Sequence, residues 1–113
     1  MKRIGIGDTN EKHFFKPEEI ILLKGIGDNT IVYVTDPAEG EGWKTIHCTH
    51  NLKYYQNQLP TTDFYRVNKN TVVQLDAVRT LKRDRTIILR IACCASITVS
   101  EHYLPSFKKQ MSV

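Results

Sequence analysis

Apolar residues along the chain fall into short runs and alternations, a pattern typical of strands rather than of long helices. Ile20 to Leu23 form one continuous apolar run. The segments 30–35 and 43–48 are rich in β-branched and aromatic residues and flank a turn-forming stretch at 36–42, which predicts a pair of strands. Similar patterns continue at 64–67, 71–75, 76–81, 86–92 and 97–99. We therefore expect many short strands.

Helical periodicity is clearest in one short segment. Leu52, Tyr55 and Leu59 fall on one stripe at helical spacing. Thr49 or Asn51 can cap the start of this helix, and the proline that follows Leu59 ends it.

Two other segments favour short helical structure. The Pro-Glu-Glu sequence at 17–19 predicts one helical turn or a tight bend. Ser100 can cap a last short helix over 101–109. The chain is thus predicted to be mainly β with short helices (α+β), organised as an N-terminal edge segment at 1–13 and a single domain at 14–113.

Length and composition set limits on this fold. The chain has 113 residues, of which 41% are hydrophobic and 25% charged, and this suits one ordinary globular domain. Its longest uninterrupted apolar run has far fewer than the ~20 residues of a membrane span. No segment has the pattern of a signal peptide. We expect a soluble, cytoplasmic protein without a membrane partner.

Positive charge is concentrated in the second half of the chain. Residues 1–60 carry seven basic and eight acidic side chains, whereas residues 61–113 carry nine basic and four acidic ones. The net charges of the two halves are therefore −1 and +5. Such an asymmetry favours a surface that meets a polyanion, and the Lys-Arg-Asp-Arg sequence at 82–85 is a charged turn within that half.

The sequence offers little support for catalysis. It contains no phosphate-binding glycine loop, nucleophile elbow or His-Glu-x-x-His helix, so we expect neither an enzyme nor a cofactor.

Metal binding is a sharper alternative. Its candidate ligands are His47, Cys48, His50, Cys93, Cys94 and His102. Neighbouring residues of a strand point to opposite faces, and no Cys-x-x-Cys pair is present. We therefore expect reduced cysteines and no metal.

A family resemblance is carried by the segment 63–78, Asp-Phe-Tyr-Arg-Val-Asn-Lys-Asn-Thr-Val-Val-Gln-Leu-Asp-Ala-Val. It is similar to the central signature of the LytTR DNA-binding domain. The flanks agree in order: Pro-Glu-Glu-Ile-Ile at 17–21, Asn-Leu-Lys-Tyr-Tyr at 51–55 and Ile-Thr-Val-Ser at 97–100. The resemblance implies an elongated stack of small antiparallel sheets. It also implies a bacterial transcription regulator, usually the output domain of a two-component response regulator.

The resemblance further implies how the domain contacts DNA. Loops and a C-terminal helix start would enter neighbouring major grooves, the first loop being 25–30 and the second 68–70. The residues that we expect to contact DNA are Asn29, Thr30, Arg66, Asn68, Lys69, Asn70, Lys82, Arg83, Arg85, Ser100, His102 and Lys108.

Four positions depart from the family pattern. Asn68 stands where a His is usual, Asn70 where a Ser is usual, Gln74 where an Asn is usual, and Glu101 where an Arg is usual. The acidic residue leaves open an alternative, a LytTR-like protein-interaction module that has lost specific DNA binding.

The partner implied by the resemblance is double-stranded DNA with paired sites. A homodimer on DNA, and a receiver domain or sensor as a further partner, stay open. The 113 residues leave no room for a receiver domain within this chain.

Overall fold

The computed structural model describes residues 3–36, 42–93 and 96–113. The first half of this part contains β1 (Ile4–Gly7), β2 (Lys12–Phe15), the 3-10 turn η1 (Pro17–Glu19), β3 (Ile20–Ile26), β4 (Asn29–Thr35), β5 (Trp43–Cys48) and α1 (Leu52–Gln56). The second half contains β6 (Phe64–Asn68), β7 (Thr71–Gln74), the 3-10 turn η2 (Leu75–Ala77), β8 (Val78–Leu81), β9 (Thr86–Leu89), β10 (Ile97–Thr98) and α2 (Leu104–Gln110).

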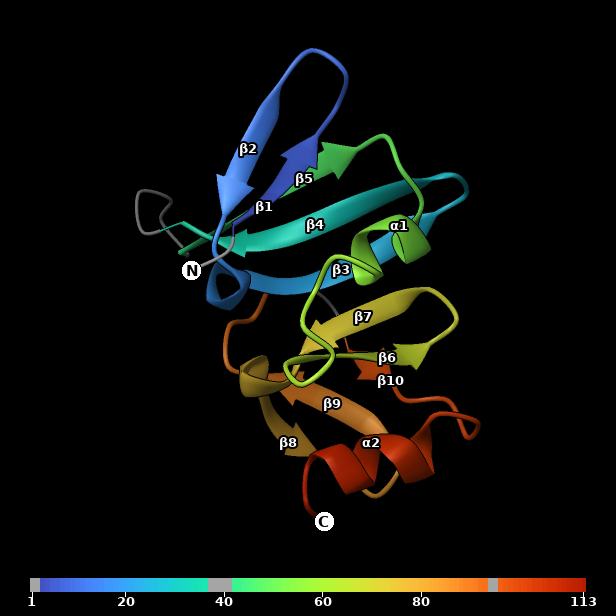
Figure 1. Cartoon of the computed structure of the whole chain (residues 1–113). Coiled ribbons are helices and arrows are strands. Elements are labelled where there is room, and N and C mark those ends of the chain that lie inside the picture. Colours follow the sequence, from blue (N-terminus) through green and yellow to red (C-terminus); the bar gives the residue numbers. More distant parts are fainter. Residues whose placement is uncertain (1–2, 37–41, 94–95) are drawn as a thin grey trace.

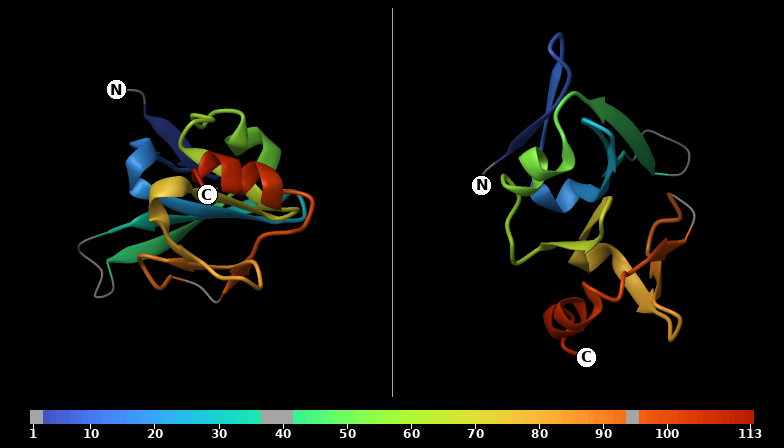
Figure 2. Two further views of the ribbon diagram at one scale, coloured as in Figure 1. Left: turned by 90° about the horizontal axis from the view of Figure 1, so that it is seen from below. Right: turned by 90° about the vertical axis from the view of Figure 1, so that its right-hand side faces the viewer.

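The described residues form three antiparallel sheets, which are stacked along the molecule (Figure 1). The central sheet has five strands in the order β5-β4-β3-β7-β6. The β1–β2 hairpin lies on one side of it, and the sheet β10-β9-β8 lies on the other (Figure 2). The molecule is elongated, with extents of 42 × 29 × 28 Å.

The central sheet separates two hydrophobic cores. Leu23 and Val72 pack into one core, with the β1–β2 hairpin and α1. Their chain neighbours Leu22 and Val73 pack into the other, with the sheet β10-β9-β8 and α2. Successive side chains of a strand point to opposite faces, so continuous apolar runs are what a sheet covered on both faces requires.

The predicted helix forms but is shorter than expected, because α1 ends at Gln56 and residues 57–59 form turns and a bend before the proline. Asn51 caps it, because its Oδ1 accepts a hydrogen bond of 3.0 Å from the backbone N–H of Tyr54. Leu52, Tyr55 and Leu59 are all buried. A Cβ atom at Gly25 would lie 3.3 Å from that of Leu52, so the glycine lets the helix approach β3 closely.

The first loop, which the resemblance places at 25–30, is much shorter in the structure. Strand β3 continues through Ile26 and pairs with β4 up to Asn29, which leaves a two-residue turn. Gly27 has a φ of +58° and supplies the left-handed backbone that such tight hairpins need. The resemblance implied a loop, but pairing between β3 and β4 makes most of this segment a strand.

The predicted start of the last helix is wrong. Residues 101–103 form turns, and α2 begins at Leu104 with Pro105 in its first turn. The Ser100 hydroxyl does not cap the helix; it is buried without a hydrogen-bond partner in the described chain. No helix of the described residues is long and apolar enough to cross a membrane.

The segment at the N-terminal end of the chain also differs in detail from the prediction. The expected edge segment 1–13 contains β1, whose Ile4 and Ile6 are buried in the first core. Its expected boundary with the domain 14–113 lies within β2.

Candidate nucleic-acid interface

Three segments that are distant in sequence lie along one edge of the molecule. They are the β3–β4 turn, the β6–β7 turn and the chain that follows β10 (Figure 1, right-hand side). We call this surface, at residues 26–29, 68–70 and 98–102, the loop edge.

Hydrogen bonds tie the three segments together. The backbone N–H of Gly25 donates to the carbonyl of Asn70 at 2.8 Å, and that of Ser100 donates to the carbonyl of Val67 at 2.8 Å. A hollow of about 370 Å³ lies between the two turns and β10. The loop edge is therefore one connected surface.

Asn68 holds the centre of the loop edge. Its Nδ2 donates to the carbonyl of Thr98 at 3.0 Å. Its Oδ1 accepts from the backbone N–H of Asn70 at 2.9 Å, which fixes the β6–β7 turn. Both polar groups of this half-buried side chain are engaged, so its role in this geometry is to position the turn.

Four of the predicted contact residues present exposed side chains on the loop edge. They are Asn29, Lys69, Asn70 and His102. Asn29 lies beside Ile26, which is 57% exposed. Amides and a lysine ammonium can hydrogen-bond base edges or phosphates, so this edge has suitable chemistry for DNA.

Thr30 does not belong to this surface. Its side chain is buried, and its Oγ1 donates to the backbone carbonyl of His50 at 2.8 Å. In this structure the side chain of Thr30 is therefore not exposed for contact with DNA. Its hydroxyl instead anchors the entry to α1 against β4.

Arg66 lies away from the turns, on the edge strand β6. It is half-buried and lines a separate cavity with Gln56, Tyr103 and Gln110. Its Nε is buried without a hydrogen-bond partner in the described chain.

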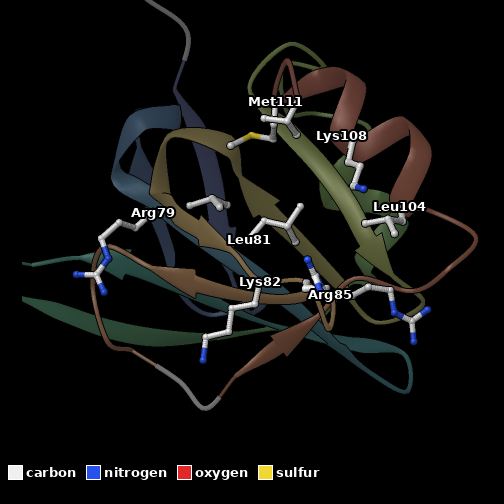
Figure 3. Close-up of a pocket in the computed structure, with 10 residues that line it drawn as sticks. Arg79, Leu81, Lys82, Arg85, Leu104, Lys108 and Met111 are labelled. Carbon is white, nitrogen blue, oxygen red and sulfur yellow. The ribbon is translucent and has the colours of Figure 1, made fainter.

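A second cluster is formed by the β8–β9 hairpin and α2. The hairpin and helix border a cavity of about 530 Å³, which we call the basic pocket (Figure 3). Its basic lining residues are Arg79, Lys82, Arg83, Arg85 and Lys108. All of these except Arg79 are among the residues predicted to contact DNA. Lys108 is distant from the others in sequence, and the fold brings it to them.

Glu101 pairs with one of these cations. Its Oε1 lies 3.3 Å from the Nη1 of Arg85. The carboxylate side chain is 88% exposed, so the pair contributes little to stability. Its main electrostatic effect is to lower the positive charge where the loop edge meets the basic pocket.

The turn that carries Arg83 and Arg85 is fixed by a carboxylate. Hydrogen bonding from Thr86 lowers the pKa of Asp84, whose Oδ1 accepts from the Thr86 backbone N–H at 3.1 Å. Arg85 has a φ of +72°, an uncommon conformation for a residue other than glycine. Its carbonyl accepts from the backbone N–H of Val99 at 2.9 Å, which links this turn to the chain after β10.

The sequence did not reveal that Thr98 takes part in this surface. Its carbonyl receives the Asn68 side chain, and with Ser96 it borders the hollow between the turns. These residues are about thirty positions from Asn68, and only the pairing of β10 with β9 brings them there. No local pattern carries that information.

The candidate metal ligands are not gathered. Within residues 3–36, 42–93 and 96–113, no three His, Cys, Asp or Glu side chains come together at a metal site. Cys48 is buried, whereas its neighbour His47 is exposed on the other face of β5. Cys94 lies outside the described residues.

Comparison with known proteins gives one family and one fold. The family model described as the LytTr DNA-binding domain matches residues 10–112. Among solved structures, the chain is similar to the LytTr DNA-binding domain of a protein described as a methyl-accepting/DNA response regulator from Bacillus cereus. The TM-score is 0.73 at 18% identity, over 100% of this chain and 99% of that chain. The likeness confirms the predicted fold class; a comparison with curated proteins gives no match.

Proposed function

Because the chain belongs to the LytTR DNA-binding domain family, as its central segment predicted, we propose that it binds double-stranded DNA sequence-specifically and regulates transcription. The family is one of DNA-binding domains and is not a class of enzymes. The observation that carries the proposal is the loop edge, where exposed amide and ammonium groups are held on paired turns beside a cluster of cations.

The two surfaces have different tasks in this proposal. Asn29, Lys69 and Asn70 reach base edges in the major groove, where amides and ammonium groups can distinguish bases. The basic pocket neutralises phosphates and supplies most of the affinity. Asn68 keeps the second turn in place through its bonds to Asn70 and Thr98.

The dimensions of the molecule suit contacts in neighbouring grooves. Its longest extent is 42 Å, and successive major grooves on one side of B-DNA are about 34 Å apart. We propose that two copies occupy paired sites, as the family resemblance implies. In the cell, a receiver domain or sensor would control such a cytoplasmic response-regulator output domain.

Substitution of Lys69 tests the role of the loop edge. We expect Lys69→Ala to weaken binding to a selected operator by about 1–3 kcal/mol and to relax preference at one base position. Lys12→Ala is the matched control, because Lys12 is an exposed lysine on β2, outside both proposed contact surfaces. Titration of labelled duplexes by fluorescence anisotropy measures both effects. Equal affinities and preferences for the two variants would remove Lys69 from the interface.

The interaction-module alternative rests on Glu101. A carboxylate beside phosphates is unfavourable, and its pairing with Arg85 reduces the charge available for DNA. This alternative predicts a folded protein without sequence preference in a selection from random duplexes. A reproducible recovered motif would exclude it.

A further inference from the structure

The basic pocket contains more than cations. Its apolar lining is formed by Val78, Leu81, Leu104 and Met111, with the exposed Val113 at the rim. In Figure 3, Leu81, Leu104 and Met111 surround the hollow, whereas the charged ends of Arg79 and Lys82 extend outwards. Phosphate binding requires cations at the surface, but it does not account for an apolar hollow between a hairpin and a helix.

The size and charge of the hollow suit a particular ligand class. Ligand sites commonly have volumes of about 300–1,000 Å³ with apolar walls and a few polar groups, and this hollow has about 530 Å³. Among the described residues, five basic side chains and no acidic ones line it. Of the carboxylates nearby, Asp84 accepts from Thr86, whereas Glu101 pairs with Arg85 and so reduces the charge of one lining cation.

We propose that the basic pocket binds a small amphipathic anion, a molecule with a compact apolar body and a carboxylate or similar anionic head. The body would contact Leu81, Leu104 and Met111, and the head would be held at the rim by Lys108 and the hairpin cations. This inference about the binding site is independent of DNA binding.

The surroundings favour a compact ligand over an extended peptide. The cavity that adjoins the basic pocket at Met111 is lined by Asp63, Asp76, Thr62 and Gln110. An acidic peptide that continued in that direction would meet two carboxylates and polar side chains. A ligand confined to the basic pocket avoids this repulsion.

The site would also give the domain a means of regulation, a consequence that rests on the proposed function. Lys82, Arg83, Arg85 and Lys108 are the same cations that we expect to neutralise phosphates. A bound anion would compensate their charge and lower the affinity for DNA.

The matched pair Lys108→Gln and Lys109→Gln tests the site in the full chain without DNA. Both lysines are exposed on α2, but only Lys108 lines the pocket. The probe is decanoate below its micelle concentration, followed by NMR chemical shifts, with decanol and acetate as the neutral and the headgroup-only comparisons. We expect saturable one-to-one binding of decanoate that shifts signals of β8, β9 and α2. Lys108→Gln should weaken it roughly three- to tenfold, while Lys109→Gln should leave it within about twofold.

Several results would overturn the inference. These are an absence of saturable decanoate binding, shifts confined to other surfaces, equal effects of the two variants, or decanol binding as tightly as decanoate. A peptide that alternates Glu and Leu and binds in a Lys108-dependent way while decanoate does not would assign the pocket to a protein partner instead. Because no DNA is present, none of these outcomes depends on whether the domain recognises an operator.

Discussion

Tyr55 shows how a single buried residue links stability to pH. Its hydroxyl lies in the first core near Cys48, and burial raises the pKa of the phenol. The unfolded chain therefore loses this proton first, at a pH of about 10, while the folded chain keeps it. The stabilisation is present below that pH and is lost as the pH rises further.

Tyr55→Phe should remove this sensitivity. The phenol oxygen has no hydrogen-bond partner in the described chain, so we expect the variant to be as stable at neutral pH as the unmodified chain, or up to about 1 kcal/mol more stable. Above pH ~10 its advantage should grow, because the buried ionisable group is gone. Urea unfolding at several pH values measures this. Tyr54→Phe, at a residue that is 45% exposed, should keep the loss of stability at high pH.

Glu101 is the second residue whose effect can be isolated. Glu101→Gln keeps the shape of the side chain but frees Arg85 from its ion pair. We expect DNA affinity at low salt to rise roughly two- to fivefold. If Arg85 then contacts a phosphate, the logarithm of the affinity should also fall more steeply with the logarithm of the salt concentration, by a slope difference of about 0.9. Glu18→Gln, an equal charge change in η1, is the control for net charge. An affinity gain of the same size in both variants would contradict a local effect at Arg85.

At the scale of elements, local sequence patterns predicted those helices and strands that local interactions determine. The cap at Asn51 and the stripe of Leu52 and Tyr55 predicted α1, and the β-branched run at 30–35 predicted β4. The extent of β3 was not predictable, because its last residues are held by pairing with β4 rather than decided by their own glycine-rich sequence.

In the candidate site, too, some features follow from local sequence and others depend on contacts between distant segments. Its exposed turn residues follow from polar sequences between strands, as at 68–70. The burial of Thr30, the turn after Ser100 and the bond from Asn68 to Thr98 depend on contacts between distant segments. The family resemblance located the loops, but only tertiary packing decides which of their side chains remain free.

Asn68→Ala tests whether this residue holds the β6–β7 turn. The variant loses the bonds to the Thr98 carbonyl and the Asn70 N–H, and we expect it to be destabilised by about 1–2 kcal/mol. Asn10→Ala is the comparison, an exposed asparagine in the β1–β2 turn, for which a change within about 0.5 kcal/mol is expected. Denaturant midpoints give both values. Equal midpoints would show that Asn68 is free to serve another purpose.

At the scale of the whole molecule, one central sheet organises both stability and function. Each face of that sheet buries its own core, so the chain stacks into a long body rather than a compact sphere. The turns at one end of β3, β4, β6 and β7 are left free by this stacking and form the loop edge (Figure 1). The β8–β9 hairpin and α2 add the basic pocket near it.

Sequence-specific recognition by the loop edge is tested most directly by a selection from random duplex DNA at two salt concentrations. We expect a recovered motif in paired copies that persists at the higher salt, with centres about 10 base pairs or a multiple apart. We also expect the affinity to fall with salt by about 0.9 log units, per log unit of salt, for each phosphate neutralised. Recovery of no motif, or binding that shows no preference and vanishes at the higher salt, would contradict sequence-specific recognition by the loop edge.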